Sequence, residues 1–184
     1  MLEIGFGRGE VLIEMARAAP DRTFLGVEVS RKRALKGARR VDRAEVPNVR
    51  IVCSTAEYLL ERVLPDGSIA ECWVNFPDPW PKKRHHKRRL IRPELVRRIV
   101  RVLEPGALLH IATDHAAYAT WIAEVMREAP GLRNLHAPDS CSRAQPCRPE
   151  TGYEAEFLAE GRIISYFEYR TGPAPERVSG GPLR

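Results

Sequence analysis

Short apolar runs alternate along the chain with longer segments that carry apolar residues at helical spacing, and this alternation constrains the fold more than any other feature. The apolar runs lie at 2–4, 23–29, 49–53, 69–75 and 107–113. The helical patterns lie at 10–18, 31–44, 56–64, 91–103 and 118–129. A weaker strand at 132–136, a short helix at 153–159 and a last strand at 163–169 follow. Such alternation predicts an α/β fold with a doubly wound, mostly parallel sheet.

The length of the chain, 184 residues, predicts a single domain. We place that domain at residues 1–170 and expect the glycine- and proline-rich remainder, 171–184, to be a mobile tail. The first strand is predicted to be central in the sheet, yet only residues 1–4 are present to form it, whereas strands usually have about five to six residues. We therefore expect that an N-terminal segment is missing from this sequence.

The composition is that of a soluble globular protein, with 43% hydrophobic and 29% charged residues. No apolar run approaches the roughly 18 residues of a membrane span, and no charged-then-apolar leader opens the chain. We therefore expect a cytoplasmic protein without a membrane partner. Neither the four cysteines nor the adjacent His85 and His86 have the spacing of a metal site, so we also expect no bound metal.

Every loop that carries candidate chemistry follows a predicted strand. These loops are 5–9, 28–30, 54–57, 75–89 and 113–115. In open parallel sheets, ligands bind outside the carboxyl ends of the strands. The sequence therefore predicts one binding site at this edge of the sheet.

The loop after the first strand carries three glycines at alternate positions, Gly5, Gly7 and Gly9. Glu28 ends the next strand, where a carboxylate can hold ribose hydroxyls. A dinucleotide-binding loop has its third glycine three positions after the second, but here that position is Glu10, whose carboxylate would repel a pyrophosphate. The glycine spacing, with Glu3 two residues before it, resembles instead the cofactor loop of S-adenosylmethionine-dependent methyltransferases.

Positive charge is concentrated in two runs, although the net charge is only +6. Residues 31–43 carry seven cations and residues 82–89 carry six. This clustering favours a polyanionic partner, because each neutralised phosphate releases condensed counterions. The alternative, a solvated helix face, stays open, above all for 31–43.

The second basic run directly follows Asp78, which stands between Pro77 and Pro79 and close to Trp80. Prolines stiffen a loop because they fix φ and remove N–H donors. Trp80 can stack on a flat base, or it can simply pack in the core.

Several stretches together resemble the bacterial tRNA (guanine-N7)-methyltransferase family. They are Glu3-Ile4-Gly5-Phe6-Gly7, Gly26-Val27-Glu28, the run from Phe76 to Arg89, Ala112-Thr113-Asp114 and Thr151-Gly152-Tyr153-Glu154. The resemblance spans nearly the whole chain. It implies a Rossmann-like class I methyltransferase fold with an antiparallel last strand. It also implies methyl transfer from S-adenosylmethionine to N7 of a guanine in the variable loop of tRNA.

The resemblance further implies roles for individual residues. Asp78 would be catalytic, because its carboxylate can accept hydrogen bonds from the edge of guanine while the ring gains positive charge. The cofactor-binding residues would be Glu3, Gly5, Gly7, Gly9, Glu28, Thr55 and Asn75. The substrate-binding residues would be Lys82, Arg84, Lys87, Arg88, Arg89, Asp114, Thr151 and Glu154.

One departure from the family concerns the end of the third strand. Many members have Asp or Asn there to contact adenine, whereas this chain has Ser54 and Thr55, which supply hydroxyls. Two alternatives to the implied function stay open. One is a methyltransferase for another substrate, and the other is an RNA-binding domain whose catalysis is impaired by the missing segment. The sequence indicates neither the oligomeric state nor which tRNAs are used.

Overall fold

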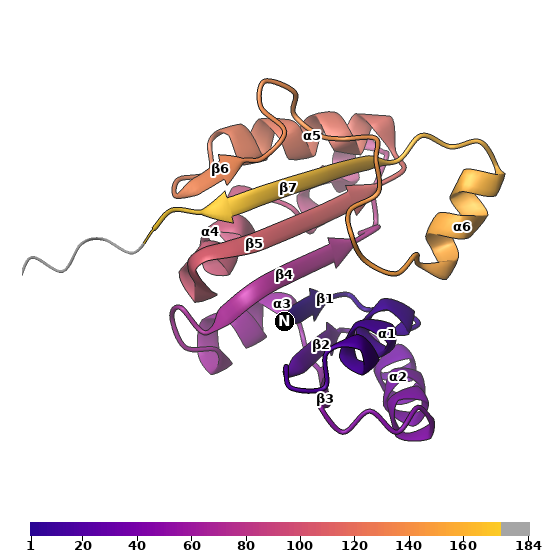
Figure 1. The fold of residues 1–184 in the computed structure, drawn as a ribbon. Helices are drawn as coiled ribbons and strands as arrows, with labels where there is room; N and C mark the ends of the chain where they lie inside the picture. Colours follow the sequence, from indigo (N-terminus) through magenta and orange to yellow (C-terminus); the bar gives the residue numbers. More distant parts are fainter. Residues whose placement is uncertain (174–184) are drawn as a thin grey trace, which may run out of the picture.

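The computed structural model describes residues 1–173, so most of the tail predicted at 171–184 lies outside the described residues. Within them a seven-stranded sheet has the order β3-β2-β1-β4-β5-β7-β6. The strands are β1 Leu2–Ile4, β2 Phe24–Glu28, β3 Val49–Cys53, β4 Ile69–Asn75, β5 Leu103–Thr113, β6 Leu132–Asn134 and β7 Ser165–Thr171. β1 to β5 pair in parallel, whereas β7 is antiparallel to β5 and to β6. The predicted α/β sheet with an antiparallel last strand is confirmed (Figure 1).

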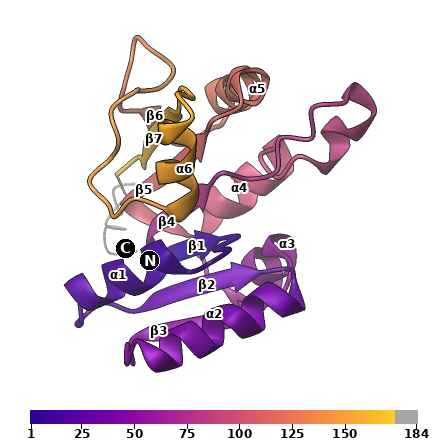
Figure 2. The same cartoon turned by 90° about the vertical axis from the view of Figure 1, so that its right-hand side faces the viewer.

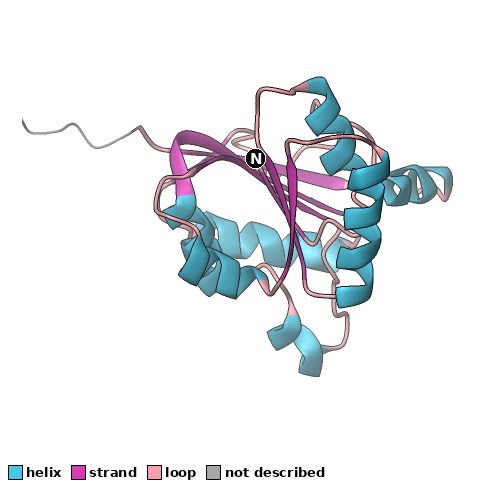
Figure 3. Ribbon diagram, turned by 90° about the horizontal axis from the view of Figure 1, so that it is seen from below, coloured by secondary structure: helices cyan, strands magenta, loops and turns pink. Residues whose placement is uncertain are grey.

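The helices lie on both faces of the twisted sheet (Figure 3). They are α1 Glu10–Ala18, α2 Arg31–Arg43, α3 Ala56–Tyr58, α4 Pro93–Val102, α5 Ala116–Arg127 and α6 Gly152–Ala159. α2 begins as its sequence predicts, because Ser30 Oγ accepts a hydrogen bond from the N–H of Arg33. α6 lies beyond the carboxyl ends of the strands, beside the start of α1 (Figure 2).

Three local expectations needed correction. The helix predicted at 56–64 is one α-helical turn, α3, that continues as the π-helical turn η1, Leu59–Val63. The strand predicted at 107–113 begins at Leu103, because residues 103–106 extend β5 with a shift in register opposite Ile69. Within the loop predicted at 75–89, residues Lys83–Arg88 form a 3-10 helix, η2.

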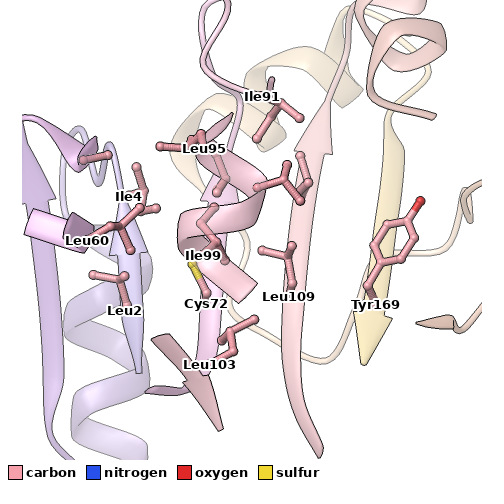
Figure 4. Close-up of a cluster of buried hydrophobic side chains, with 14 of the residues drawn as sticks. Leu2, Ile4, Leu60, Cys72, Ile91, Leu95, Ile99, Leu103, Leu109 and Tyr169 are labelled. Carbon is pink, nitrogen blue, oxygen red and sulfur yellow. The ribbon is translucent and has the colours of Figure 1, made fainter. Parts of the chain in front are cut away.

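The larger core packs α3, α4 and α5 against one face of the sheet. Figure 4 shows Leu95 and Ile99 of α4 directed at β-strand residues such as Leu2, Cys72 and Leu109. Apolar residues recur at 95, 96, 99 and 102, and all are buried, so this face of α4 stabilises the sheet mainly through burial.

A second core lies between the other face of the sheet and helices α1 and α2. Phe6, from the glycine loop, fits against two glycines of this region. A Cβ at Gly37 would lie 2.4 Å from the Phe6 ring, and a Cβ at Gly26 would lie 2.7 Å from it. These two glycines therefore allow the loop to pack tightly against α2 and β2, a requirement that no periodic pattern indicates.

Candidate active site

Two adjoining pockets lie at the carboxyl ends of β1, β2, β4 and β5. The first has a volume of about 330 Å³ and is lined by Val27, Glu28, Ser54, Thr55, Trp80 and Leu90, among others. The second has a volume of about 380 Å³ and is lined by Glu3, Glu10, Asp114, Thr151, Tyr153 and Phe157, among others. Both pockets share Gly5, Arg33, Asn75, Phe76, Pro77 and Asp78. The predicted edge of the sheet is thus the site of both cavities, and Asp78 lies at their boundary.

The glycine loop forms the floor of the second pocket. Gly5, Gly7 and Gly9 have φ values of 74°, 55° and 74°, a region that residues with a Cβ rarely adopt. The end of this loop is bound to the start of α6, because Glu10 Oε2 accepts a hydrogen bond of 2.9 Å from the N–H of Gly152. Glu10 therefore holds the start of α6, while its carboxylate also lines the second pocket.

The first pocket has the polar groups that a nucleoside requires. Glu28 is buried at the end of β2, and its Oε1 accepts a hydrogen bond of 2.8 Å from the N–H of Ser30. Thr55 also lines this pocket, but its hydroxyl already caps α3 by accepting from the N–H of Tyr58 at 3.2 Å. The Thr55 hydroxyl therefore has its donor proton left to offer a ligand.

Glu3 is the most perturbed acid of the site. Its side chain is buried at the end of β1, where Oε1 accepts a hydrogen bond from Asn75 Nδ2 at 3.1 Å, and Oε2 has no partner among the described residues. Burial raises the pKa of Glu3 to about 7, although the Asn75 hydrogen bond and the charge of Arg148 oppose this effect. Glu3 thus fits a cationic ligand group, which would both supply the missing partner and favour the carboxylate.

The loop that carries Asp78 is held in an unusual conformation. Phe76 and Trp80, on either side of Asp78, have φ values of 48° and 43°, which non-glycine residues rarely adopt. Such positions cost on the order of 1–3 kcal/mol each and persist only where neighbours enforce them. Asp78 itself is exposed and lines both pockets. The loop therefore presents a carboxylate to both cavities from a fixed backbone.

Arg89 enforces part of this conformation. Its side chain is buried, its Nε donates to the carbonyl of Pro79 at 2.9 Å, and its guanidinium lies about 5 Å from the rings of Tyr118 and Trp121. Arg89 thus faces the interior of the protein. Lys82, Arg84, Lys87 and Arg88 are exposed, and only Arg88 lines a pocket, with its guanidinium over the Trp80 ring.

Glu154 likewise faces inward. Arg148 donates to both of its oxygens, at 2.7 and 3.1 Å, and both side chains are fully buried. The Tyr166 hydroxyl donates to Oε1 at 2.5 Å, and the Thr151 N–H donates to Oε2 at 3.1 Å. In return, Thr151 Oγ1 accepts from the Glu154 N–H, which completes a capping box at the start of α6. Glu154 lines neither pocket, whereas Thr151 lines the second.

Asp114 lies at the end of β5 and lines the second pocket, where its Oδ2 accepts a hydrogen bond of 2.8 Å from Arg162. The site therefore brings together Glu3, Asn75, Asp78, Asp114 and Thr151 around one cavity.

Sequence reasoning missed Arg33, Arg148 and Arg162 as residues of this region. Arg33 lines both pockets, Arg148 fixes Glu154, and Arg162 pairs with Asp114. Arg148 lies in a segment without periodicity, and nothing local distinguishes these three from the other arginines.

The described residues contain no group of three or more His, Cys, Asp or Glu side chains placed to hold a metal ion. None of the helices within residues 1–173 is long and apolar enough to cross a membrane.

Solved structures of other methyltransferases share this fold. A SAM-dependent methyltransferase from Aquifex aeolicus superposes with a TM-score of 0.63 at 14% sequence identity, over 92% of this chain and 80% of that chain. A 16S rRNA methyltransferase superposes with a TM-score of 0.63 at 18% identity, over 94% and 87% of the two chains. The sheet order and the glycine loop define a class I S-adenosylmethionine-dependent methyltransferase fold.

Sequence comparison identifies the family. A family model described as a putative methyltransferase matches residues 1–166. The tRNA (guanine-N(7)-)-methyltransferase of Alkalilimnicola ehrlichii is 42% identical over 175 residues, which cover 95% of this chain and 73% of that protein. The enzyme of the same name from Alcanivorax borkumensis is 42% identical over 172 residues, covering 92% and 72%. The chain belongs to the tRNA (guanine-N(7)-)-methyltransferase family, so the resemblance found in the sequence is confirmed.

The buried ion pair gives a first prediction. We expect Arg148→Met to lower the free energy of unfolding by about 3–5 kcal/mol, because it leaves the Glu154 charge buried without its main partner. Urea unfolding followed by circular dichroism measures this. Arg8→Gln is the control, because the Arg8–Glu156 pair is exposed and is worth less than about 1 kcal/mol. Equal losses in the two variants would contradict the role given to Arg148.

Glu3 gives a second prediction, in which pH is the variable. The pKa of about 7 in the folded state exceeds the ordinary 4.5, so the folded protein binds more protons, and its stability falls as pH rises from about 4.5 to 7. Glu3→Gln should remove this loss and raise the free energy of unfolding at pH 8 by up to about 3 kcal/mol. It should also weaken S-adenosylmethionine binding.

Unfolding at pH 5 and pH 8 and calorimetric titration with the cofactor measure the two effects of Glu3→Gln. The control is Glu14→Gln, on the exposed face of α1. A variant that keeps the pH dependence of the parent protein would show that Glu3 is not the group responsible.

Proposed function

We propose that this protein transfers a methyl group from S-adenosylmethionine to N7 of a guanine in the variable loop of tRNA, in the cytoplasm. The observation that carries this proposal is the position of Asp78. Its carboxylate lines both the nucleoside-sized first pocket and the acidic, aromatic second pocket. Membership in the family supports the reaction and the nucleic-acid substrate.

The residues around the first pocket and the glycine loop fit the methyl donor. When bound, S-adenosylmethionine supplies an electrophilic methyl group. Glu28 would hold the ribose hydroxyls, and Glu3, oriented by Asn75, would bind the amino group. The backbone of Gly5, Gly7 and Gly9 allows close approach because no Cβ obstructs it. At the third strand, the Thr55 hydroxyl can donate to a ring nitrogen of adenine.

The residues around the second pocket fit a guanine. N7 of guanine carries no proton, so attack on the methyl group requires alignment and a favourable field more than a strong base. Asp78 would accept hydrogen bonds from the N1–H and the amino group, and its charge would stabilise the cationic ring that forms. Thr151 and Asp114, which also line this pocket, would position the nucleotide.

The exposed cations next to the site would hold the tRNA backbone. Lys82, Arg84, Lys87 and Arg88 lie on or beside η2, directly after the Asp78 loop. Phosphate contacts of this kind position the nucleic acid and carry no sequence information. Arg89 and Glu154 would act from inside the protein, since their side chains are buried.

Incubation of the purified chain with radiolabelled methyl donor and unmodified tRNA tests the function. We expect 7-methylguanosine at one position of the variable loop, mapped by borohydride and aniline cleavage. Methylation at another base or position, or label in protein alone, would contradict the proposal.

Asp78→Asn tests the catalytic assignment. The amide keeps the size of the side chain but turns one acceptor into a donor and removes the charge beside the reacting ring. We expect the single-turnover rate to fall about 100-fold or more, as for the loss of one preorganised electrostatic contact. Affinity for tRNA should change little, because phosphate contacts dominate it. A near-normal rate would remove Asp78 from the catalytic group.

A further inference from the structure

Arg162 occupies part of the second pocket. Its Nη1 donates to Asp114 Oδ2 at 2.8 Å, and its guanidinium carbon lies 4.5 Å from the centre of the Phe157 ring. Its Nη2 lies 2.7 Å from a carboxylate oxygen of Glu160, whose side chain is exposed. A flat cation is thus held between a carboxylate and an aromatic face inside the substrate side of the site.

The Phe157 ring is itself held in place. It packs edge-on against Phe76, with ring centres 5.5 Å apart, and lies beside Tyr153 at 6.3 Å. The backbone N–H of Arg162 donates to the carbonyl of Phe157 at 2.9 Å, which ties the arginine to the helix that carries the ring. The aromatic wall is therefore a fixed feature of the pocket, whereas the Arg162 side chain is nearly half exposed, at 46%.

Guanine and a guanidinium group present the same chemistry to such a wall. Each is planar, and each directs N–H donors in its own plane at a carboxylate; in guanine, the N1–H and one N–H of the N2 amino group would meet Asp78, and the second amino N–H is left for Asp114. Each also offers a flat face to an aromatic ring. Adenine has an acceptor at N1 and lacks the N2 amino group, so it does not match.

We propose that Asp114 and Phe157 form a slot for the guanine base, and that Arg162 fills this slot in the free enzyme and competes with the base for it. This inference rests on the proposed function, since it assumes that a guanine enters the second pocket. It goes beyond that function by assigning a stacking role to Phe157 and an opposing role to Arg162.

The energetics permit exchange. An ion pair with one well-exposed partner is worth about 0.2–1 kcal/mol, so the base can displace it at little cost. While Arg162 occupies the slot, it keeps Asp114 paired and the Phe157 ring covered. A base that lacks the donor edge gains less from Asp114 than Arg162 does, so the arginine would discriminate against it.

The direction in which one mutation changes the affinity for guanosine separates this role from ordinary RNA binding. If Arg162 competes with the base, Arg162→Gln should tighten guanosine binding about 2- to 5-fold, the equivalent of one exposed ion pair. If Arg162 helps to bind the substrate, the same change should weaken it. Guanosine is the probe because it has no phosphate, so the loss of a cation does not affect it directly.

The titration follows protein chemical shifts by NMR with S-adenosylhomocysteine at saturation, which keeps guanosine out of the cofactor pocket. Arg8→Gln is the matched control, because Arg8 lies 4.7 Å over the Tyr153 ring of the same pocket but pairs with the rim residue Glu156. Arg8→Gln should leave guanosine affinity unchanged.

In an Asp114→Asn background, Arg162→Gln should give no gain in guanosine affinity. Inosine, which lacks the N2 amino group, should bind more weakly than guanosine.

Unchanged or weaker guanosine binding by Arg162→Gln overturns the competition, as does a gain that survives in the Asp114→Asn background. Failure of the proposed function is detected by a separate experiment, the methylation assay, in which the parent protein would leave tRNA unmethylated. The titration requires no turnover, so it still decides whether Asp114, Phe157 and Arg162 form a guanine slot.

Discussion

The geometry of the site depends on the buried ion pair between Glu154 and Arg148. Arg148 neutralises the Glu154 carboxylate with two hydrogen bonds, and Tyr166 and Thr151 use its remaining capacity. These contacts join the loop before α6, the start of α6 and strand β7. Because a buried charge without partners is costly, these contacts favour the arrangement of the three segments that keeps the Glu154 carboxylate paired. The wall of the second pocket therefore depends partly on Arg148, Glu154 and Tyr166, which do not line it.

The loop after β4 is fixed by a comparable device. Two non-glycine residues with positive φ would relax if the loop were free, and the inward-facing Arg89 opposes this by binding the carbonyl of Pro79. A carboxylate on such a loop does not need to be ordered when a base arrives, so its electrostatic effect on the reaction comes without a reorganisation cost. Arg89 thus links the packed interior of the protein to the loop that carries Asp78.

The sheet, its edge of ligand-binding loops and the family could be predicted from the sequence, because these depend on local periodicity and on contiguous motifs. The glycine loop is an example: its positive φ values follow from residue type alone. The direction in which a charged side chain points could not be predicted. Arg88 and Arg89 are neighbours in one basic run, yet one lies at the pocket and the other stacks on Tyr118 and Trp121. That difference is decided by tertiary packing, which leaves no local signal.

Tertiary packing also decides the environment of the acidic side chains of the site, and this affects their chemistry. Glu3 is buried with one unpaired oxygen and so has a raised pKa, Glu154 is buried with every oxygen paired, and Asp78 is exposed. Desolvation of Glu3, with one oxygen unpaired, favours its neutral form unless a cation pairs with it, while full pairing makes Glu154 a structural anchor. Asp78 is exposed, so in the proposed reaction it would meet donors that arrive with the substrate. The carboxylates of one site thus differ in burial and in pairing because the fold gives each of them a different number of partners.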